Sequence, residues 1–179
     1  VLQGILHEAN RGQQIITDLE TYLDNHSREL ERFQKDDPVR ILKEILDQYT
    51  ETCKEQEINC RANLTHPNSL WIRPTDIGRL FTELLGRSFT AVKKLENRDV
   101  QIHVSKSGEA VEFVIAHSGT DNGCNRFLPK DSEHWSREGK SAGNGIGLSL
   151  CERISKEHGG SFHCRSDAAA GTRYHLTLP

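Results

Sequence analysis

The stretch GNGIGLSLCERISKEHGGSF, residues 143–162, decides the fold. Its glycines Gly143, Gly145 and Gly147 alternate directly before a helix that the apolar spacing predicts from Gly147 to about His158. Glycines at the start of a helix let backbone N–H groups approach an anion closely, and the helix dipole favours negative charge there. By itself the stretch fits either a helix whose first turn can receive an anion or an ordinary helix entrance.

The segments around this stretch alternate between strand-like and helix-like patterns. Helices are predicted over 1–34, from Pro38 to before Ile58, and from Pro74 to about Leu95. Strands are predicted at 58–64, 70–72, 100–104, 111–115, 161–165 and 172–178. Helices followed by a mixture of strands and helices are typical of an α+β fold. We expect a two-layer sandwich of helices on a mixed, mostly antiparallel sheet, preceded by a long N-terminal helix.

Asp36-Asp37-Pro38 divides the chain into two expected domains. Before it, apolar residues recur at spacings of three, four and seven, which is typical of a helix that packs in a coiled coil or bundle. After it, Asp37 can cap a new helix that has Pro38 in its first position. We expect a long helix as the first domain, residues 1–36, and the sandwich as the second, residues 37–179.

The composition narrows the class of protein. The chain has 179 residues, of which 35% are hydrophobic and 27% charged, enough for one core. Its net charge is −3 with no basic stripe, so nucleic acid is not an expected partner. No apolar run is long enough for a membrane helix, so we expect a cytoplasmic fragment without membrane contact. Because the chain begins at Val1 and lacks Met, we expect it to belong to a longer protein.

The cysteines suggest no covalent framework. There are five, an odd number, and no two of them form a C-x-x-C pair. Neither a disulfide framework nor a zinc site is predicted from this spacing. We expect reduced, scattered thiols. The positions are Cys53, Cys60, Cys124, Cys151 and Cys164.

Three segments carry a resemblance to a known family. GNGIGL (143–148) with the helix LSLCERISKEHGGSF and the strand GTRYHLTLP (171–179) resembles the ATP-binding catalytic domain of two-component sensor histidine kinases, which is related to gyrase, Hsp90 and MutL. RPTDIGRLFTELLGRSFTAVKK (73–94) resembles the helix that carries the N box of this family. Residues 1–34 are similar to the second helix of the dimerisation and phosphotransfer hairpin. The resemblance covers essentially the whole chain.

The resemblance implies a nucleotide site with two departures from the family pattern. Where an N-box Asn would offer an oxygen to magnesium, this chain has Arg87, which has five donors and no lone pair. Arg87 could contact phosphate or could be a solvated helix residue, and both alternatives stay open. One turn earlier, Glu83 matches an acid that polarises the phosphoacceptor in the family, or it is an ordinary surface residue.

The second departure is at the first glycine box, where an acid should contact adenine. Strand alternation puts His117 at that position, followed by Gly119. A register shifted by four residues puts Asp121 there instead, and we prefer the first register. The expected cofactor is ATP, with magnesium binding doubtful. The residues expected to contact the nucleotide are Arg87, His117, Gly119, Gly143, Gly145, Gly147, Leu148 and Thr172.

Three functions follow from the resemblance. The first is a degenerate domain, a pseudokinase or scaffold in a phosphorelay, which forms a homodimer through residues 1–34 and docks a response-regulator receiver domain or another histidine kinase. The second is an active ATP-dependent histidine kinase. The third is a histidine phosphotransferase, for which His7, followed by Glu8, is the candidate phosphoacceptor. We favour the degenerate domain.

Overall fold

The computed structural model describes residues 32–64, 69–127 and 146–179. The second of two compact units, Gln34–Pro179, carries all the elements described below. Most of the expected N-terminal helix, with His7, lies outside the described residues. The end of the expected first domain differs from prediction, because Gln34–Asp36 form a strand, β1, rather than the last turn of a helix.

The segment predicted as one helix, from Pro38 to before Ile58, begins where the sequence predicts but is divided in two. Helix α2 (Pro38–Gln48) has Pro38 in its first turn, and the Asp37 carboxylate caps it by accepting a hydrogen bond of 2.9 Å from the Val39 N–H. The chain then breaks at Tyr49 and continues as α3 (Thr50–Glu55). At the break, the Tyr49 ring stacks on Phe89 with centroids 4.4 Å apart.

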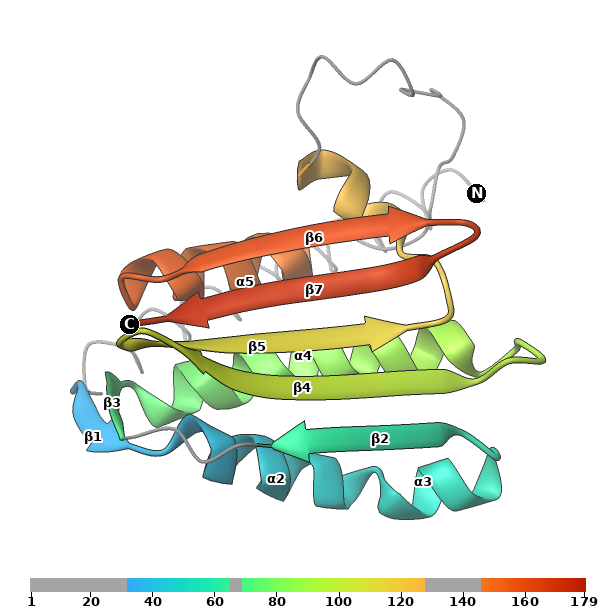
Figure 1. Ribbon diagram of the computed structural model, residues 1–179, viewed down its shortest axis with the longest axis horizontal. Helices are drawn as coiled ribbons and strands as arrows, with labels where there is room; N and C mark the ends of the chain where they lie inside the picture. Colours follow the sequence, from blue (N-terminus) through green and yellow to red (C-terminus); the bar gives the residue numbers. More distant parts are fainter. Residues whose placement is uncertain (1–31, 65–68, 128–145) are drawn as a thin grey trace, which may run out of the picture. The chain divides into compact units, whose positions relative to one another are not determined.

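A five-stranded sheet forms one layer. Its strands lie in the order β2-β4-β5-β7-β6, from bottom to top in Figure 1. Strand β2 pairs in parallel with β4, and the other three pairs are antiparallel, so the sheet is mixed and mostly antiparallel. The strands are β2 (Asn59–Leu64), β4 (Asp99–Ser107), β5 (Ala110–His117), β6 (Ser161–Asp167) and β7 (Gly171–Leu178).

Helices α4 (Pro74–Val92) and α5 (Ile146–Glu157) cover one face of this sheet (Figure 1). Alternate residues of the central strands point toward them and are buried, as period-two patterning requires. The core includes Val100, Ile102, Val104, Phe113, Ile115, Tyr174 and Leu176 from the sheet and Ile77, Leu80, Phe81, Leu84 and Leu85 from α4. This packing determines which faces of α4 and β5 are buried. It therefore also determines where the polar side chains of these two elements, such as Arg87 and His117, are placed.

The beginning of α4 is fastened to the end of α5. The Arg73 guanidinium contacts the Glu157 carboxylate at 2.5 Å, and the Arg73 N–H donates to Nε2 of His158 at 3.1 Å. The His158 Nδ1 lies 2.8 Å from the Ile154 carbonyl oxygen. Burial lowers the pKa of His158, which favours the neutral imidazole that can accept from Arg73. The two helices therefore meet in a fixed relationship.

A separate two-stranded sheet precedes α4. Strand β1 pairs antiparallel with β3 (Leu70–Ile72). Leu70 and Ile72 are buried in the core, whereas Trp71 between them is 63% exposed. Phe33, just before β1, is also exposed. Two large apolar side chains therefore stand in solvent near the start of the described fold.

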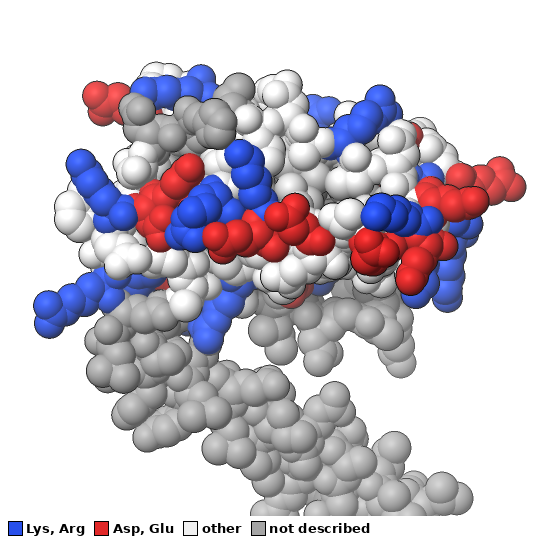
Figure 2. Space-filling model, turned by 90° about the horizontal axis from the view of Figure 1, so that it is seen from below, with Lys and Arg blue, Asp and Glu red and all other residues white. Residues whose placement is uncertain are grey.

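Charges of both signs intermix on the face seen from below in Figure 2. On α2, Arg40 pairs with Asp36 and Glu44, and on α3, Lys54 pairs with Glu51. These exposed pairs add little to stability. In the described ranges, no helix has the length and apolarity to cross a membrane.

Candidate functional site

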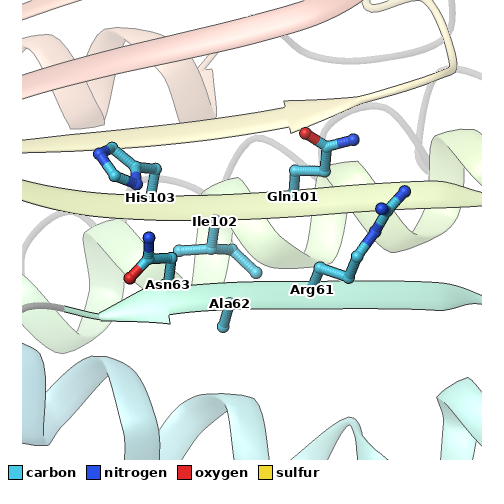
Figure 3. Close-up of a pocket in the computed structure, with 6 residues that line it drawn as sticks. All are labelled: Arg61, Ala62, Asn63, Gln101, Ile102 and His103. Carbon is cyan, nitrogen blue, oxygen red and sulfur yellow. The ribbon is translucent and has the colours of Figure 1, made fainter.

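A pocket of about 420 Å³ lies between α4 and the segment that follows β5. It contains two of the predicted site residues, Glu83 and Arg87, together with Asp121 from the alternative register. Its remaining lining residues are Thr82, Gly86, Thr90, Ala91 and Thr120. A smaller hollow of about 230 Å³ lies on β2 and β4 (Figure 3), but its lining, from Arg61 to Asn63 and from Gln101 to His103, includes none of the predicted site residues.

Two carboxylates hold the Arg87 side chain, which is only 22% exposed. Its Nε lies 2.7 Å from Oδ2 of Asp121 and its Nη2 lies 3.0 Å from Oδ1 of the same carboxylate, a bidentate pair. Its Nη1 donates to Oε1 of Glu83, one helical turn earlier, at 3.1 Å. The hydrogen bond to Asp121 raises the pKa of the guanidinium further, so its charge is permanent. The interpretation of Arg87 as a solvated helix residue is therefore wrong.

The Asp121 carboxylate accepts from two further groups. The Tyr174 hydroxyl donates to Oδ2 at 2.6 Å, and the Gly123 N–H donates to Oδ1 at 2.8 Å. Burial alone would raise the pKa of Asp121, but the hydrogen bonds from Arg87, Tyr174 and Gly123 outweigh burial and hold it below its usual value. Asp121 is thus an ionised carboxylate whose two oxygens are already engaged.

His117 occupies the last position of β5 and points inward, as strand alternation predicts. It is 3% exposed, and its Nε2 lies 3.4 Å from the Tyr174 hydroxyl. Its Nδ1 has no hydrogen-bond partner among the described residues. Burial lowers the pKa of His117 to about 4, so the imidazole is neutral at pH 7. His117 and Asp121 therefore converge on one tyrosine, but only Asp121 lines the pocket.

A chain of hydroxyl groups fixes the segment between His117 and Asp121. The Thr172 hydroxyl donates to the Gly119 carbonyl oxygen at 2.8 Å and lies 2.9 Å from Oγ of Ser166. The Ser166 hydroxyl in turn accepts from the Asp121 N–H at 2.8 Å. Thr172 and Gly119, both predicted as nucleotide contacts, thus hold the loop on the ends of β6 and β7.

Gly147 and Leu148 of the predicted glycine box lie in the first turn of α5. A Cβ atom added to Gly147 would overlap the Glu83 carboxylate. Gly147 therefore lets α5 approach α4 at the rim of the pocket. Leu148 is buried, and its Cδ1 lies 3.0 Å from the position that a Cβ on Gly123 would take. Gly143 and Gly145 lie outside the described residues.

The prediction of scattered, reduced thiols is wrong for two of the cysteines. Cys124 and Cys164 form a disulfide with Cα atoms 5.2 Å apart. Cys124 belongs to the short helix η1 (Asn122–Phe127), and Cys164 to β6. The two lie 40 residues apart, and only the fold brings them together, which cysteine spacing alone could not indicate.

Tyr174 was missed as a site residue by sequence reasoning. It lies within the strand GTRYHLTLP, where its alternation marks it only as a core position. Burial raises its pKa, and it donates to Asp121 while contacting His117. A buried tyrosine needs a partner for its hydroxyl. That requirement is the one signal that could have linked it to a polar site.

Comparisons with known proteins agree on one family. The model of the family described as "Histidine kinase-, DNA gyrase B-, and HSP90-like ATPase" matches residues 72–179, more than half of the chain. The adaptive-response sensory kinase SasA of Trichormus variabilis is 27% identical over 146 residues, which cover 79% of this chain and 35% of that protein. The sensor histidine kinase ZraS of Escherichia coli O157:H7 is 27% identical over 128 residues, 71% of this chain and 27% of that protein.

Solved structures share the fold. The catalytic domain of the histidine kinase ThkA superposes with a TM-score of 0.62 at 19% identity, covering 82% of this chain and 95% of that one. At this identity the likeness concerns the fold alone. The chain spans about a third or less of the curated relatives SasA and ZraS.

Proposed function

Because the chain belongs to the histidine kinase-, DNA gyrase B- and HSP90-like ATPases, as the ATPase domain of a sensor histidine kinase, we propose that it is a degenerate member of that family. In this proposal the domain keeps the fold and has weak or lost use of magnesium and ATP. The observation that carries it is the pairing of Arg87 with Asp121 inside the pocket.

The first argument concerns the metal. Magnesium requires oxygen ligands in near-octahedral geometry. At the position where the resemblance implies an Asn oxygen, Arg87 presents only donors and a permanent positive charge. The nearby Glu83 oxygen already accepts from Arg87. Among the described residues, no three His, Cys, Asp or Glu side chains are grouped so that they could hold a metal ion. The residues do not fit magnesium, and we derive no step through it.

The second argument concerns the adenine contact. An adenine amino group needs a free acceptor. Asp121 has its oxygens engaged by Arg87, Tyr174 and Gly123, so a nucleotide would have to displace one of these donors. The Nδ1 of His117 has no hydrogen-bond partner in the described ranges, but His117 is buried and does not line the pocket. Both registers of the first glycine box thus lack an acceptor that is ready for adenine.

The expected loss of affinity follows from these two arguments. Hydrogen bonds to charged groups contribute roughly 1.5–3 kcal/mol each. Losing the metal ligand and the adenine acid together would weaken nucleotide binding by about two to four decades. The glycine box remains as an anion-binding element, which favours weak binding over none.

The biological role follows as part of the same proposal. A cytoplasmic module without turnover would act as a pseudokinase or scaffold, which dimerises through residues 1–34 and docks a receiver domain or an active histidine kinase. The active-kinase and phosphotransferase alternatives each require a chemical group that the pocket residues do not supply. The first needs a magnesium ligand, and the second needs a phosphoacceptor, for which only His7 is a candidate.

Isothermal titration tests the proposal. ATP is added to the folded chain with magnesium, and in a parallel series with chelator. We expect no heat up to millimolar nucleotide, or weak binding that is equal in both series. In the second case Arg87 would contact the phosphates directly, and Arg87→Ala should abolish the signal. Magnesium-dependent binding at micromolar nucleotide would overturn the proposal and support the active-kinase alternative.

A further inference from the structure

The disulfide lies next to the pocket. Cys124 follows Asp121 by three residues, and its N–H donates to the Asp121 carbonyl oxygen at 3.1 Å. Its partner Cys164 lies on β6, two residues before Ser166, whose hydroxyl accepts from the Asp121 N–H at 2.8 Å. Residues 121–124 are therefore held on β6 at both ends, by the hydrogen bond at Asp121 and by the disulfide at Cys124.

The same segment carries the carboxylate that neutralises Arg87. Asp121 reaches Arg87 with its side chain while its backbone is held to β6. Gly123 lies so close that a Cβ atom there would stand 2.8 Å from Nη2 of Arg87. A displacement of residues 121–124 away from β6 would therefore change the distance between Asp121 and Arg87 directly.

We propose that Cys124 and Cys164 are a reversible thiol–disulfide site that controls whether the Asp121 carboxylate stays paired with Arg87 in the pocket. With the disulfide formed, residues 121–124 stay on β6 and Asp121 stays on Arg87. With the disulfide reduced, this segment loosens and the Asp121 carboxylate becomes available to a nucleotide. The identity of the ligand rests on the proposed function above, whereas the loosening does not.

The chemistry is thiol–disulfide exchange with a dithiol reductant of the thioredoxin class. One reductant thiolate attacks a sulfur of the Cys124–Cys164 bond and forms a mixed disulfide, which releases the other cysteine as a thiolate that takes a proton. The second reductant thiol, as its thiolate, then displaces the remaining cysteine. Two electrons pass to the protein, which ends with two thiols, and the reductant ends as a disulfide. A disulfide oxidant reverses the reaction.

Access to the bond requires a local opening. Cys124 is 1% exposed and Cys164 is 6% exposed, so a reductant cannot reach either sulfur while residues 121–124 stay on β6. Cys124 lies on η1, a single short 3-10 helix, which can open at a lower free energy than β6 in the sheet. Reduction should therefore proceed through opening of residues 121–124. A substitution that weakens the Asp121–Arg87 pair should accelerate it.

The other cysteines provide internal comparisons. Cys53 and Cys60 make a thiol–thiol contact, from α3 and β2, and remain unlinked. Burial raises the pKa of Cys60 to about 11, which keeps it protonated at neutral pH. Cys151 is buried on α5 and unlinked. A C53S/C60S variant therefore isolates the proposed site without touching the pocket.

The experiment combines thiol counting with hydrogen exchange. The full chain carrying C53S/C60S is equilibrated with mixtures of reduced and oxidised dithiothreitol and then alkylated. Mass spectrometry gives the number of alkylated thiols. Amide exchange is then followed in peptides over 118–124 and, as a control, over β4. We expect reversible two-thiol conversion and at least tenfold faster exchange over 118–124 in the reduced form, with β4 unchanged. The C124S/C164S variant should reproduce the reduced form under both conditions.

A second measurement tests the coupling to Asp121. Asp121→Asn should speed the reduction by dithiothreitol roughly tenfold, which corresponds to a decrease of about 1.4 kcal/mol in the free energy of opening residues 121–124. Asp47→Asn, on the exposed surface of α2, should leave the rate unchanged. Free thiols at Cys124 and Cys164 under oxidising conditions would overturn the proposal, and so would equal exchange over 118–124 in the two forms. If amide exchange over 118–124 is faster in the reduced form but ATP binds to neither form, redox control of this segment is supported and only the assignment of a nucleotide as the ligand fails.

Discussion

Arg87 and Asp121, 34 residues apart in the chain, meet through two hydrogen bonds of 2.7 and 3.0 Å between one guanidinium and one carboxylate. The resemblance to the family implies a metal-ligand Asn at the position of Arg87 and an adenine-contacting acid four residues before Asp121. In the pocket, the single guanidinium of Arg87 contacts two carboxylates, those of Asp121 and Glu83. The Asp121 carboxylate is thus paired, which removes the cost of burying it without a partner.

Arg87→Asn should restore magnesium-dependent nucleotide binding. The substitution places an amide oxygen at the metal position and releases the Asp121 carboxylate from the guanidinium. Binding of ATP with magnesium should strengthen by about ten- to a hundredfold, the equivalent of one charge-assisted contact. Titration calorimetry with and without chelator measures the effect.

Arg87→Ala is the matched control for this gain, because it also frees Asp121 but supplies no oxygen. Lys94→Asn, which removes an exposed cation just after α4, reports the effect of charge alone. Equal binding by Arg87→Asn and Arg87→Ala would contradict the role assigned to this position.

His117 should make the protein less stable in acid. Because burial lowers its folded pKa to about 4 from an ordinary value near 6.5, the unfolded chain binds a proton below pH 6.5 that the folded chain refuses. The free energy of unfolding should therefore be at its full value at pH 7. The contribution of His117 alone should then lower it by about 3 kcal/mol as the pH drops from about 6.5 to about 4.

Urea unfolding at several pH values measures this slope. His117→Asn should flatten it, while His103→Asn, at an exposed position of β4, should not. His158, whose pKa burial also lowers, should leave a residual slope in both variants. An unchanged slope in His117→Asn would show that His117 is solvated in the folded protein.

Gly147→Ala should displace Glu83 from Arg87. The new Cβ would overlap the Glu83 carboxylate, which can swing away because it ends a flexible side chain. The loss of the 3.1 Å bond to Arg87 should lower the free energy of unfolding by about 1 kcal/mol. In a Glu83→Ala background the overlapping carboxylate is absent, so Gly147→Ala should there cost little stability, and a double-mutant cycle measures the difference.

Gly171→Ala is the contrasting case. Gly171 has φ +78°, and a Cβ there would meet the backbone carbonyl oxygen of His117, which has no freedom to move aside. We expect a larger loss than for Gly147→Ala and no rescue by Glu83→Ala. If Glu83→Ala reduced the stability loss of both glycine variants, its effect would come from a general loosening of the fold.

Reduction of the disulfide should lower global stability. The bond closes a loop between residues 40 apart, and by the chain-entropy argument its removal lowers the free energy of unfolding by about 2–4 kcal/mol. Guanidinium titrations with and without reductant measure the difference. The C124S/C164S variant should unfold identically in both series, whereas C53S/C60S should respond to reductant like the wild type.

The sequence was informative wherever structure depends on neighbours along the chain. The Asp37-Pro38 signal placed the start of α2, and the apolar spacing from Ile77 to Val92 placed α4. The 107–108 turn placed the β4–β5 hairpin, whose Gly108 indeed has a positive φ. Strand alternation also predicted correctly that His117 points inward.

The errors have a common cause, which is that they depend on pairing between distant segments. Asp121 pairs with Arg87 because the segment after β5 lies against α4. Cys124 bonds to Cys164 because β6 packs beside η1. No local sequence pattern predicts either of these two contacts. Similarly, Gln34–Asp36 become a strand only because Leu70–Ile72 pair with them. Helical spacing nearby could not reveal that pairing.

Trp71 gives the domain a built-in optical reporter. Its indole stands 63% exposed on β3, so its emission should have the long wavelength of a ring in water. The only other tryptophan is Trp135, and a Trp135→Phe variant would leave Trp71 as the sole emitter. Any protein that covered the β1–β3 ribbon would then shift this emission to shorter wavelength. Docking at the start of the fold can thus be followed without a label.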